Sequence, residues 1–204
     1  MTHLKVTLLT SLTAILSIIS SSAFAHTSAM DSSIFSGFLH PFSGLDHLLA
    51  MFAVGIWAAQ QQNKTNLMIP VGFLAFLLIG FGIGLSVITL PVIGQSSIEV
   101  GIALSVLILG LLIVNAVSLP TPWAISLVGL FALYHGVAHG TEATGASTAI
   151  FAIGFMLSSA LLHCAGVQTA NFFKNTSLFK NYAQKLSQVT GIFIALFGAS
   201  FLLY

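Results

Sequence analysis

Long apolar runs dominate the sequence from about residue 42 onward, and they limit the folds that the chain can adopt. Only 4% of the residues are charged and 57% are hydrophobic, whereas about 25% of the residues in a water-soluble domain are charged. A chain with so little charge cannot cover an ordinary aqueous surface, so we expect lipid to be its solvent. An open chain satisfies its backbone hydrogen bonds in lipid only as helix. The sequence therefore predicts an all-α membrane protein.

Six of these runs approach the roughly 20 residues that a helix needs to cross a bilayer. Short polar breaks separate them, and prolines mark two of the breaks as turns. We expect a polytopic protein in which six transmembrane helices form one domain, residues 26–204. The expected spans are about 42–60, 67–89, 97–117, 122–140, 147–169 and 186–204.

Residues 1–25 have the pattern of a cleavable secretory signal peptide. Lys5 precedes a Ser/Thr-rich apolar stretch, and an Ala-Phe-Ala sequence ends at residue 25, which is a small-x-small cleavage pattern. An uncleaved first span is the alternative. Cleavage would leave His26 as the mature N-terminus, on the periplasmic side of a bacterial inner membrane.

The distribution of lysines indicates the same orientation. If the mature N-terminus is periplasmic, the breaks at 61–66, 118–121 and 170–185 face the cytoplasm, and the outer breaks contain no lysine. Cytoplasmic segments of membrane proteins carry an excess of positive charge, so the two signals agree. The lysines in the expected cytoplasmic breaks are Lys64, Lys174, Lys180 and Lys185.

Most ionisable side chains of the mature chain gather near the expected outer ends of the spans. Five of its six histidines and three of its four carboxylates fall there. A charged group within a span costs about 2.5–3.5 kcal/mol on insertion scales, so such groups persist where they face one another or water. The sequence therefore predicts a metal site between helices. The candidate ligands are His26, His40, Asp46, His47, Glu99, His135, His139 and Glu142.

Helical spacing supports this prediction. His135, His139 and Glu142 follow an i, i+4, i+7 pattern and share one helix face, where two imidazoles and a carboxylate suit one transition-metal ion. His40 and His47 are two turns apart and share a face if the first span begins by Pro41, because proline is tolerated in a first helical turn. Asp46 then either orients His47 or faces another helix.

Other residues leave alternatives open. Met51 lies one turn from His47 and is either a soft ligand or a core residue. His163 is either a hydrogen-bonding partner between helices or a deeper step on a metal path. Cys164, the single cysteine, is expected to be buried. Gly80/Gly84 and Gly136/Gly140 have the Gly-x-x-x-Gly spacing that allows helices to approach closely.

Four segments carry a resemblance to a known family. "HPFSGLDHLLAMFAVGIWA" at 40–58 and "FALYHGVAHGTE" at 131–142 resemble the histidine blocks of the HupE/UreJ family, and "IEVGIALSVLILGL" and "GFMLSSALLH" resemble its third and fifth spans. The resemblance implies a secondary permease for nickel, in some members cobalt, often linked to hydrogenase or urease maturation. Its motif positions in this chain are His40, Asp46, His47, His135, His139 and Glu142.

The leading interpretation is a permease, and not an enzyme, that imports Ni²⁺ or Co²⁺ and holds no tightly bound cofactor. Protonation of imidazoles near neutral pH would release the ion inward. The expected partners are the metal ion and the lipid bilayer. The net charge of +1 argues against nucleic acid, and a homo-oligomer or a metal-delivery protein stays open. The sequence has no Gly-x-x-x-x-Gly-Lys-Ser/Thr motif for ATP, so a gradient or a partner must drive transport.

Two other functions use the same residues. An intramembrane metal-dependent enzyme would need an open coordination position and a general base, for which Glu142 or Asp46 would serve. A b-type haem carrier would need histidines from two facing helices, whereas His135 and His139 share one helix. The chain also has no arginine to bind a haem propionate.

Overall fold

The computed structural model describes residues 33–61, 67–86, 95–143 and 147–203, and every regular element in this part of the chain is helical. The predicted all-α fold is therefore confirmed. His26 and the predicted signal peptide lie outside the described residues. In chain order the elements are α2 (Ile34–Ser43), α3 (Leu45–Gln60), α4 (Met68–Leu85), α5 (Gln95–Val114), α6 (Thr121–Glu142), α7 (Thr148–Asn175), the short 3-10 turn η2 (Lys180–Tyr182) and α8 (Ala183–Phe201).

Each of the six predicted spans overlaps one of the long helices, α3 to α8. Four of them, α4, α5, α6 and α7, are long and apolar enough to cross a membrane, and the bent pair of α2 and α3 makes a fifth if it is counted as one span. Helix α8 does not meet this criterion, because its first two turns carry Gln184, Lys185 and Gln188. A membrane protein with several spanning helices is thus confirmed, and a sixth span stays a prediction.

The start of the first span differs from the prediction. Pro41 does not open a span but lies inside α2, a separate helix that begins at a capping box formed by Ser33 and Ser36. Gly44 then takes an extended conformation, and α3 leaves α2 at an angle of 87°. The sequence prediction started a single span near residue 42, so neither the capping box nor the bend was predicted.

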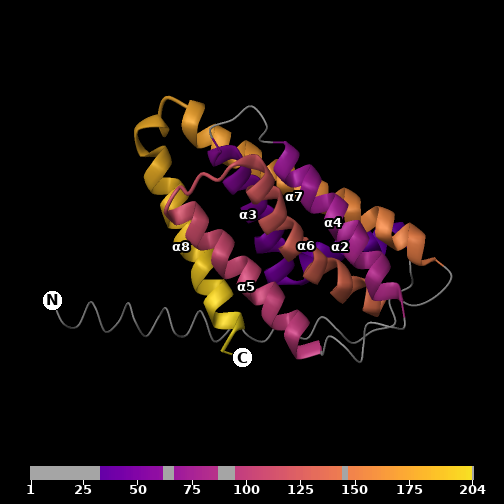
Figure 1. Ribbon diagram of the computed structural model, residues 1–204. Helices are drawn as coiled ribbons and strands as arrows, with labels where there is room; N and C mark the ends of the chain where they lie inside the picture. The colour runs from indigo at the N-terminus through magenta and orange to yellow at the C-terminus, as the bar shows by residue number, and fades with distance from the viewer. Residues whose placement is uncertain (1–32, 62–66, 87–94, 144–146, 204) are drawn as a thin grey trace, which may run out of the picture.

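Glycines bring the helices together in pairs. The predicted Gly-x-x-x-Gly positions of α4 and α6 face one another: a Cβ at Gly84 would collide with the backbone of Val137 and Gly140. Since Gly80 likewise meets the backbone around Gly136, α4 and α6 run parallel. Helices α3 and α7 are also parallel and touch at Gly55 and Gly166, whereas α5 and α8 are antiparallel and lie side by side at one edge of the bundle (Figure 1).

The glycine contact between α4 and α6 leads to a stability prediction. Gly84→Ala should destabilise the protein by about 1–3 kcal/mol, the usual cost of overpacking, because backbone atoms cannot move aside as a side chain can. Gly82→Ala is the matched control, since a Cβ there meets nothing within 4 Å. It should be neutral or slightly stabilising, because alanine is the better helix former. Thermal unfolding in detergent measures both, and equal melting temperatures would contradict the proposed contact.

Hydrogen bonds close the end of the bundle where α3 ends. Trp57 Nε1 donates to the Val117 carbonyl at 2.8 Å, and the side-chain oxygen of Gln61 accepts from the Leu119 backbone N–H at 3.1 Å. Lys174 donates to the carbonyl of Ala59 in the last turns of α3. These bonds join the α5–α6 connection and α7 to the C-terminal end of α3. The described lysines, Lys174, Lys180 and Lys185, all lie near the α7–α8 connection.

Candidate metal centre

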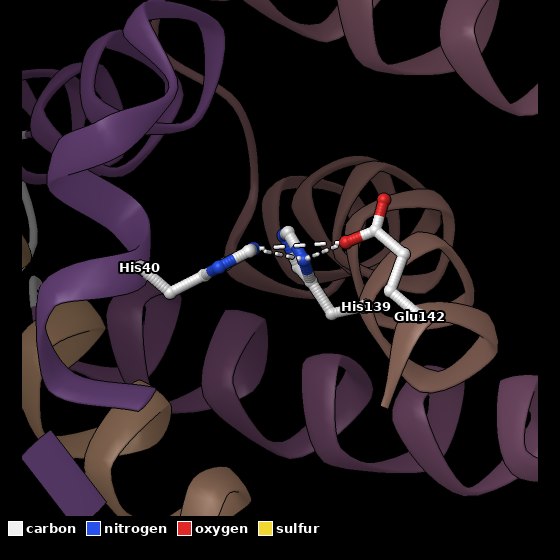
Figure 2. A group of neighbouring side chains, drawn as sticks. All are labelled: His40, His139 and Glu142. Carbon is white, nitrogen blue, oxygen red and sulfur yellow. Dashed lines mark hydrogen bonds and ion pairs between the residues drawn. The ribbon is translucent and has the colours of Figure 1, made fainter. Parts of the chain in front are cut away.

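Three side chains from two helices form a compact group of nitrogen and oxygen atoms. His40 comes from the last turn of α2, and His139 and Glu142 come from the last turn of α6 (Figure 2). The Nε2 atom of His40 and the Nδ1 atom of His139 lie 2.8 Å apart. The Oε2 atom of Glu142 is 3.4 Å from that His139 nitrogen and 3.7 Å from that His40 nitrogen. We call His40, His139 and Glu142 the mouth triad.

The mouth triad has a buried side and an open side. The side chain of His139 is 1% exposed and that of His40 is 11% exposed, whereas that of Glu142 is 36% exposed. The three ligand atoms all lie within 4.8 Å of one another. An ion arriving from the Glu142 side would therefore exchange water for a carboxylate first and for imidazoles as it moves inward.

A second pair of imidazoles continues from the triad into the bundle. His47, in the first turn of α3, has its ring centre 4.3 Å from that of His139 and 4.8 Å from that of His135. Its Nδ1 atom lies 2.9 Å from Asp46 Oδ1, which also accepts the backbone N–H of His47 at 2.9 Å. Of the two predicted roles for Asp46, the structure thus shows the orienting one. His47 and His135 are 5% and 0% exposed.

The predicted shared helix face of His40 and His47 is wrong. The two residues lie on different helices, because the chain turns at Gly44 between them. The bend nevertheless brings their ring centres to 6.5 Å. A Cβ at position 44 would lie 2.7 Å from Asp46 Oδ1 and 3.0 Å from His47 Nδ1, so the close hydrogen bond between Asp46 and His47 requires glycine there.

The predicted face of α6 is confirmed, since His135, His139 and Glu142 all take part in this cluster. Glu99 is exposed in the first turns of α5 and lies outside the mouth triad.

Met51 is buried in the core, and its carbonyl oxygen accepts a hydrogen bond from His163 Nδ1 at 2.7 Å. Cys164 is exposed on α7, so its predicted burial is wrong.

Several residues around the cluster were not predicted. The rings of Phe151 and Phe155 on α7 lie 5.4 and 6.1 Å from that of His40, and Phe155 is 4.5 Å from His139. The hydroxyl of Ser105 on α5 lies 3.0 Å from His135 Nε2 and is fully buried. Ser105 could have been noticed in the sequence, because it is a polar residue within the apolar run of α5. The chain contains 17 phenylalanines, so their identity gave no signal.

The donor set defines the class of site. Imidazole nitrogens and a carboxylate oxygen suit divalent transition metals, and buried ionisable side chains within apolar helices mark functional sites in membrane proteins. The fold and the cluster together define a polytopic helical membrane protein with a candidate site for a metal ion between its helices.

Comparison with known proteins identifies the family. The family model described as HupE / UreJ protein matches residues 14–201. The chain is also similar to "Protein HupE" of Rhizobium leguminosarum bv. viciae, with 38% identity over 181 residues, which cover 88% of this chain and 90% of that protein. The chain therefore belongs to the HupE/UreJ family. No solved structure matches it.

Proposed function

We propose that the protein is a secondary permease that imports a divalent transition-metal ion, Ni²⁺ or Co²⁺, across the bacterial inner membrane. The observation that carries the proposal is the mouth triad, in which nitrogen and oxygen atoms of His40, His139 and Glu142 from two helices lie within 4.8 Å of one another. Asp46 and His47 extend this donor set inward. Membership of the HupE/UreJ family supports transport of nickel or cobalt and does not favour an intramembrane enzyme.

The direction of the helices supports six crossings with a periplasmic start. Helices an even number of places apart in the chain run parallel: α4 and α6 are two apart, and α3 and α7 are four apart. Helices α5 and α8, which are three apart, run antiparallel. Chains that cross a membrane at each successive helix have this alternation. The mouth triad then lies at the periplasmic end. The lysines near the α7–α8 connection lie at the cytoplasmic end, as the positive-inside rule expects.

The donor set also suits a transient cargo. A transport site must bind its ion firmly enough to replace bound water and weakly enough to release it. Glu142 is the one carboxylate of the mouth triad and is 36% exposed, so it remains in contact with water at the entrance. The ion is the transported substrate in this proposal, and no resident cofactor is required.

The test is metal uptake by proteoliposomes that contain a trapped metal-sensitive dye. The wild-type protein should accumulate Ni²⁺ or Co²⁺. Uptake of one of these two ions should be inhibited more strongly by the other than by Zn²⁺ or Mn²⁺. Liposomes without protein give the background. Tight metal binding without any uptake would refute the permease and favour the enzyme.

A further inference from the structure

His163 is a buried histidine that the mouth triad does not use. It lies in the middle of α7 and is 1% exposed. Its Nδ1 atom lies 2.7 Å from the carbonyl oxygen of Met51, and its ring centre is 5.0 Å from that of Phe73. Phe73 in turn lies 6.1 Å from His135, the innermost histidine of the α6 series. One phenylalanine ring therefore contacts both His135 and His163.

The hydrogen bonds of His163 determine which of its nitrogens carries a proton. A carbonyl oxygen only accepts, so Nδ1 must donate its hydrogen to Met51. In the neutral ring the Nε2 atom is then a bare lone pair. This atom is buried and has no hydrogen-bond partner. A buried polar atom without a partner usually costs about 1–3 kcal/mol, which calls for an explanation beyond helix packing.

The same reasoning applies to His135. The hydroxyl of Ser105 donates to the Ile102 carbonyl at 2.6 Å, and a hydroxyl has a single hydrogen. Ser105 must therefore accept from His135 Nε2 at 3.0 Å, which leaves Nδ1 of His135 bare, and that atom too is buried without a partner. In metal sites one imidazole nitrogen donates to a fixed acceptor while the other binds the ion.

His47 completes the series. Its Nδ1 faces the Asp46 carboxylate at 2.9 Å, and its Nε2 is buried without a partner. Three imidazoles on three helices thus each have one nitrogen bonded to an acceptor and the other nitrogen unpartnered. These imidazoles lie at different distances from the mouth triad. Met51 lies four residues beyond His47 on α3, so its bond to His163 lies about 6 Å further into the bundle.

We propose that His163 forms an inner binding station for the transported ion, which passes from the mouth triad along the bare nitrogens of His47 and His135 to His163 Nε2. This inference rests on the proposed function and adds to it a path and a residue. The ion is a divalent transition metal, for which an imidazole nitrogen is a suitable ligand.

The structure provides a matched variant for the test. In His163→Asn, the side-chain NH₂ occupies the position of Nδ1 and keeps the hydrogen bond to Met51, but the bare Nε2 is lost. His163→Ala removes both. We expect His163→Asn to bind one Ni²⁺ in detergent with an affinity within about threefold of wild type, because the mouth triad is intact. Its uptake into proteoliposomes should fall at least about tenfold, since loss of a residue that only orients a metal ligand already costs about 10–100-fold.

The outcomes separate this inference from the proposed function. Uptake by His163→Asn within twofold of wild type would overturn the inner station and leave the permease intact. Equal loss of binding and uptake would also overturn it, because His163 would then belong to the first site. Failure of the wild-type protein to move any metal would refute the proposed function and this inference with it.

One measurement uses the wild-type protein, so its result does not depend on whether a variant folds. Nitrogen-15 spectra of histidine-labelled, metal-free wild-type protein distinguish bare from protonated ring nitrogens. We expect the His163 ring to show one protonated and one bare nitrogen at neutral pH. A His163 ring that carries protons on both nitrogens would overturn the inner station.

Discussion

His47→Ala is expected to reduce Ni²⁺ or Co²⁺ uptake to the background of empty liposomes. His47 lies between the mouth triad and His135, with ring centres 4.3 Å from His139 and 4.8 Å from His135, so its loss removes the imidazole that joins them on the proposed path. Loss of an orienting partner of a metal ligand typically costs about 10–100-fold, and loss of the ligand itself should cost more. Radioactive nickel uptake at equal membrane protein content measures the effect.

Asp46→Asn is the companion variant. It keeps the size of the side chain but removes the charge that orients His47, so uptake should fall by about 10–100-fold and not to background. Lys64→Ala, in a break that the sequence places on the cytoplasmic side, serves as the control and should change little. Near-normal uptake in both His47→Ala and Asp46→Asn would refute the proposed role of this pair. Strong loss in Lys64→Ala would mean that the metal path does not start at the predicted outer ends of the spans.

The second large effect is expected for metal binding at equilibrium. His139→Ala removes the residue whose Nδ1 contacts both other members of the mouth triad, at 2.8 Å from His40 and 3.4 Å from Glu142. We therefore expect the affinity for Ni²⁺ to fall by at least about 100-fold, the upper end of the effects that supporting residues show. Isothermal titration calorimetry in detergent measures this affinity.

Two further variants make this result specific. Glu142→Gln keeps the size of the side chain and removes the anionic oxygen, so affinity should fall less than in His139→Ala. Ser126→Ala on the same helix is the control, because Ser126 is exposed and its hydroxyl donates to the carbonyl of Pro122 at 2.9 Å, away from the mouth triad. An affinity in His139→Ala equal to that in Ser126→Ala would exclude the mouth triad as the binding site.

Features that depend on helical periodicity were predictable from the sequence. The face shared by His135, His139 and Glu142 follows from 3.6 residues per turn, and the close approach of α4 and α6 follows from paired small residues. Both are local patterns that survive folding unchanged. Helical periodicity also left two alternatives for Asp46, which either orients His47 or faces another helix.

Features that depend on tertiary contacts were not predictable. The 87° bend at Gly44 moves His40 onto a separate helix, and a single glycine between Ser43 and Leu45 does not specify such an angle. The contact of Ser105 with His135 joins residues 30 positions apart. The sequence placed His163 deeper in the bundle as one of two alternatives, but its hydrogen-bond partner, the carbonyl of Met51 112 positions away, was not predictable.

The glycine contacts divide the bundle into units that have a consequence for transport. Helices α2, α3 and α7 form one unit and α4 and α6 another, with fewer contacts between the units than within them. His40, His47 and His163 belong to the first unit, whereas His135, His139 and Glu142 belong to the second. The donor atoms therefore come from both units and lie on either side of the boundary between them. If one unit slid past the other, the coordination of a bound ion would change while the glycine contacts within each unit stayed intact.

Spin labels on Cys164 and on the Leu78→Cys variant, both at exposed positions, would report such sliding as a metal-dependent change in the distance between the labels. An unchanged distance would show that the two units do not move relative to one another.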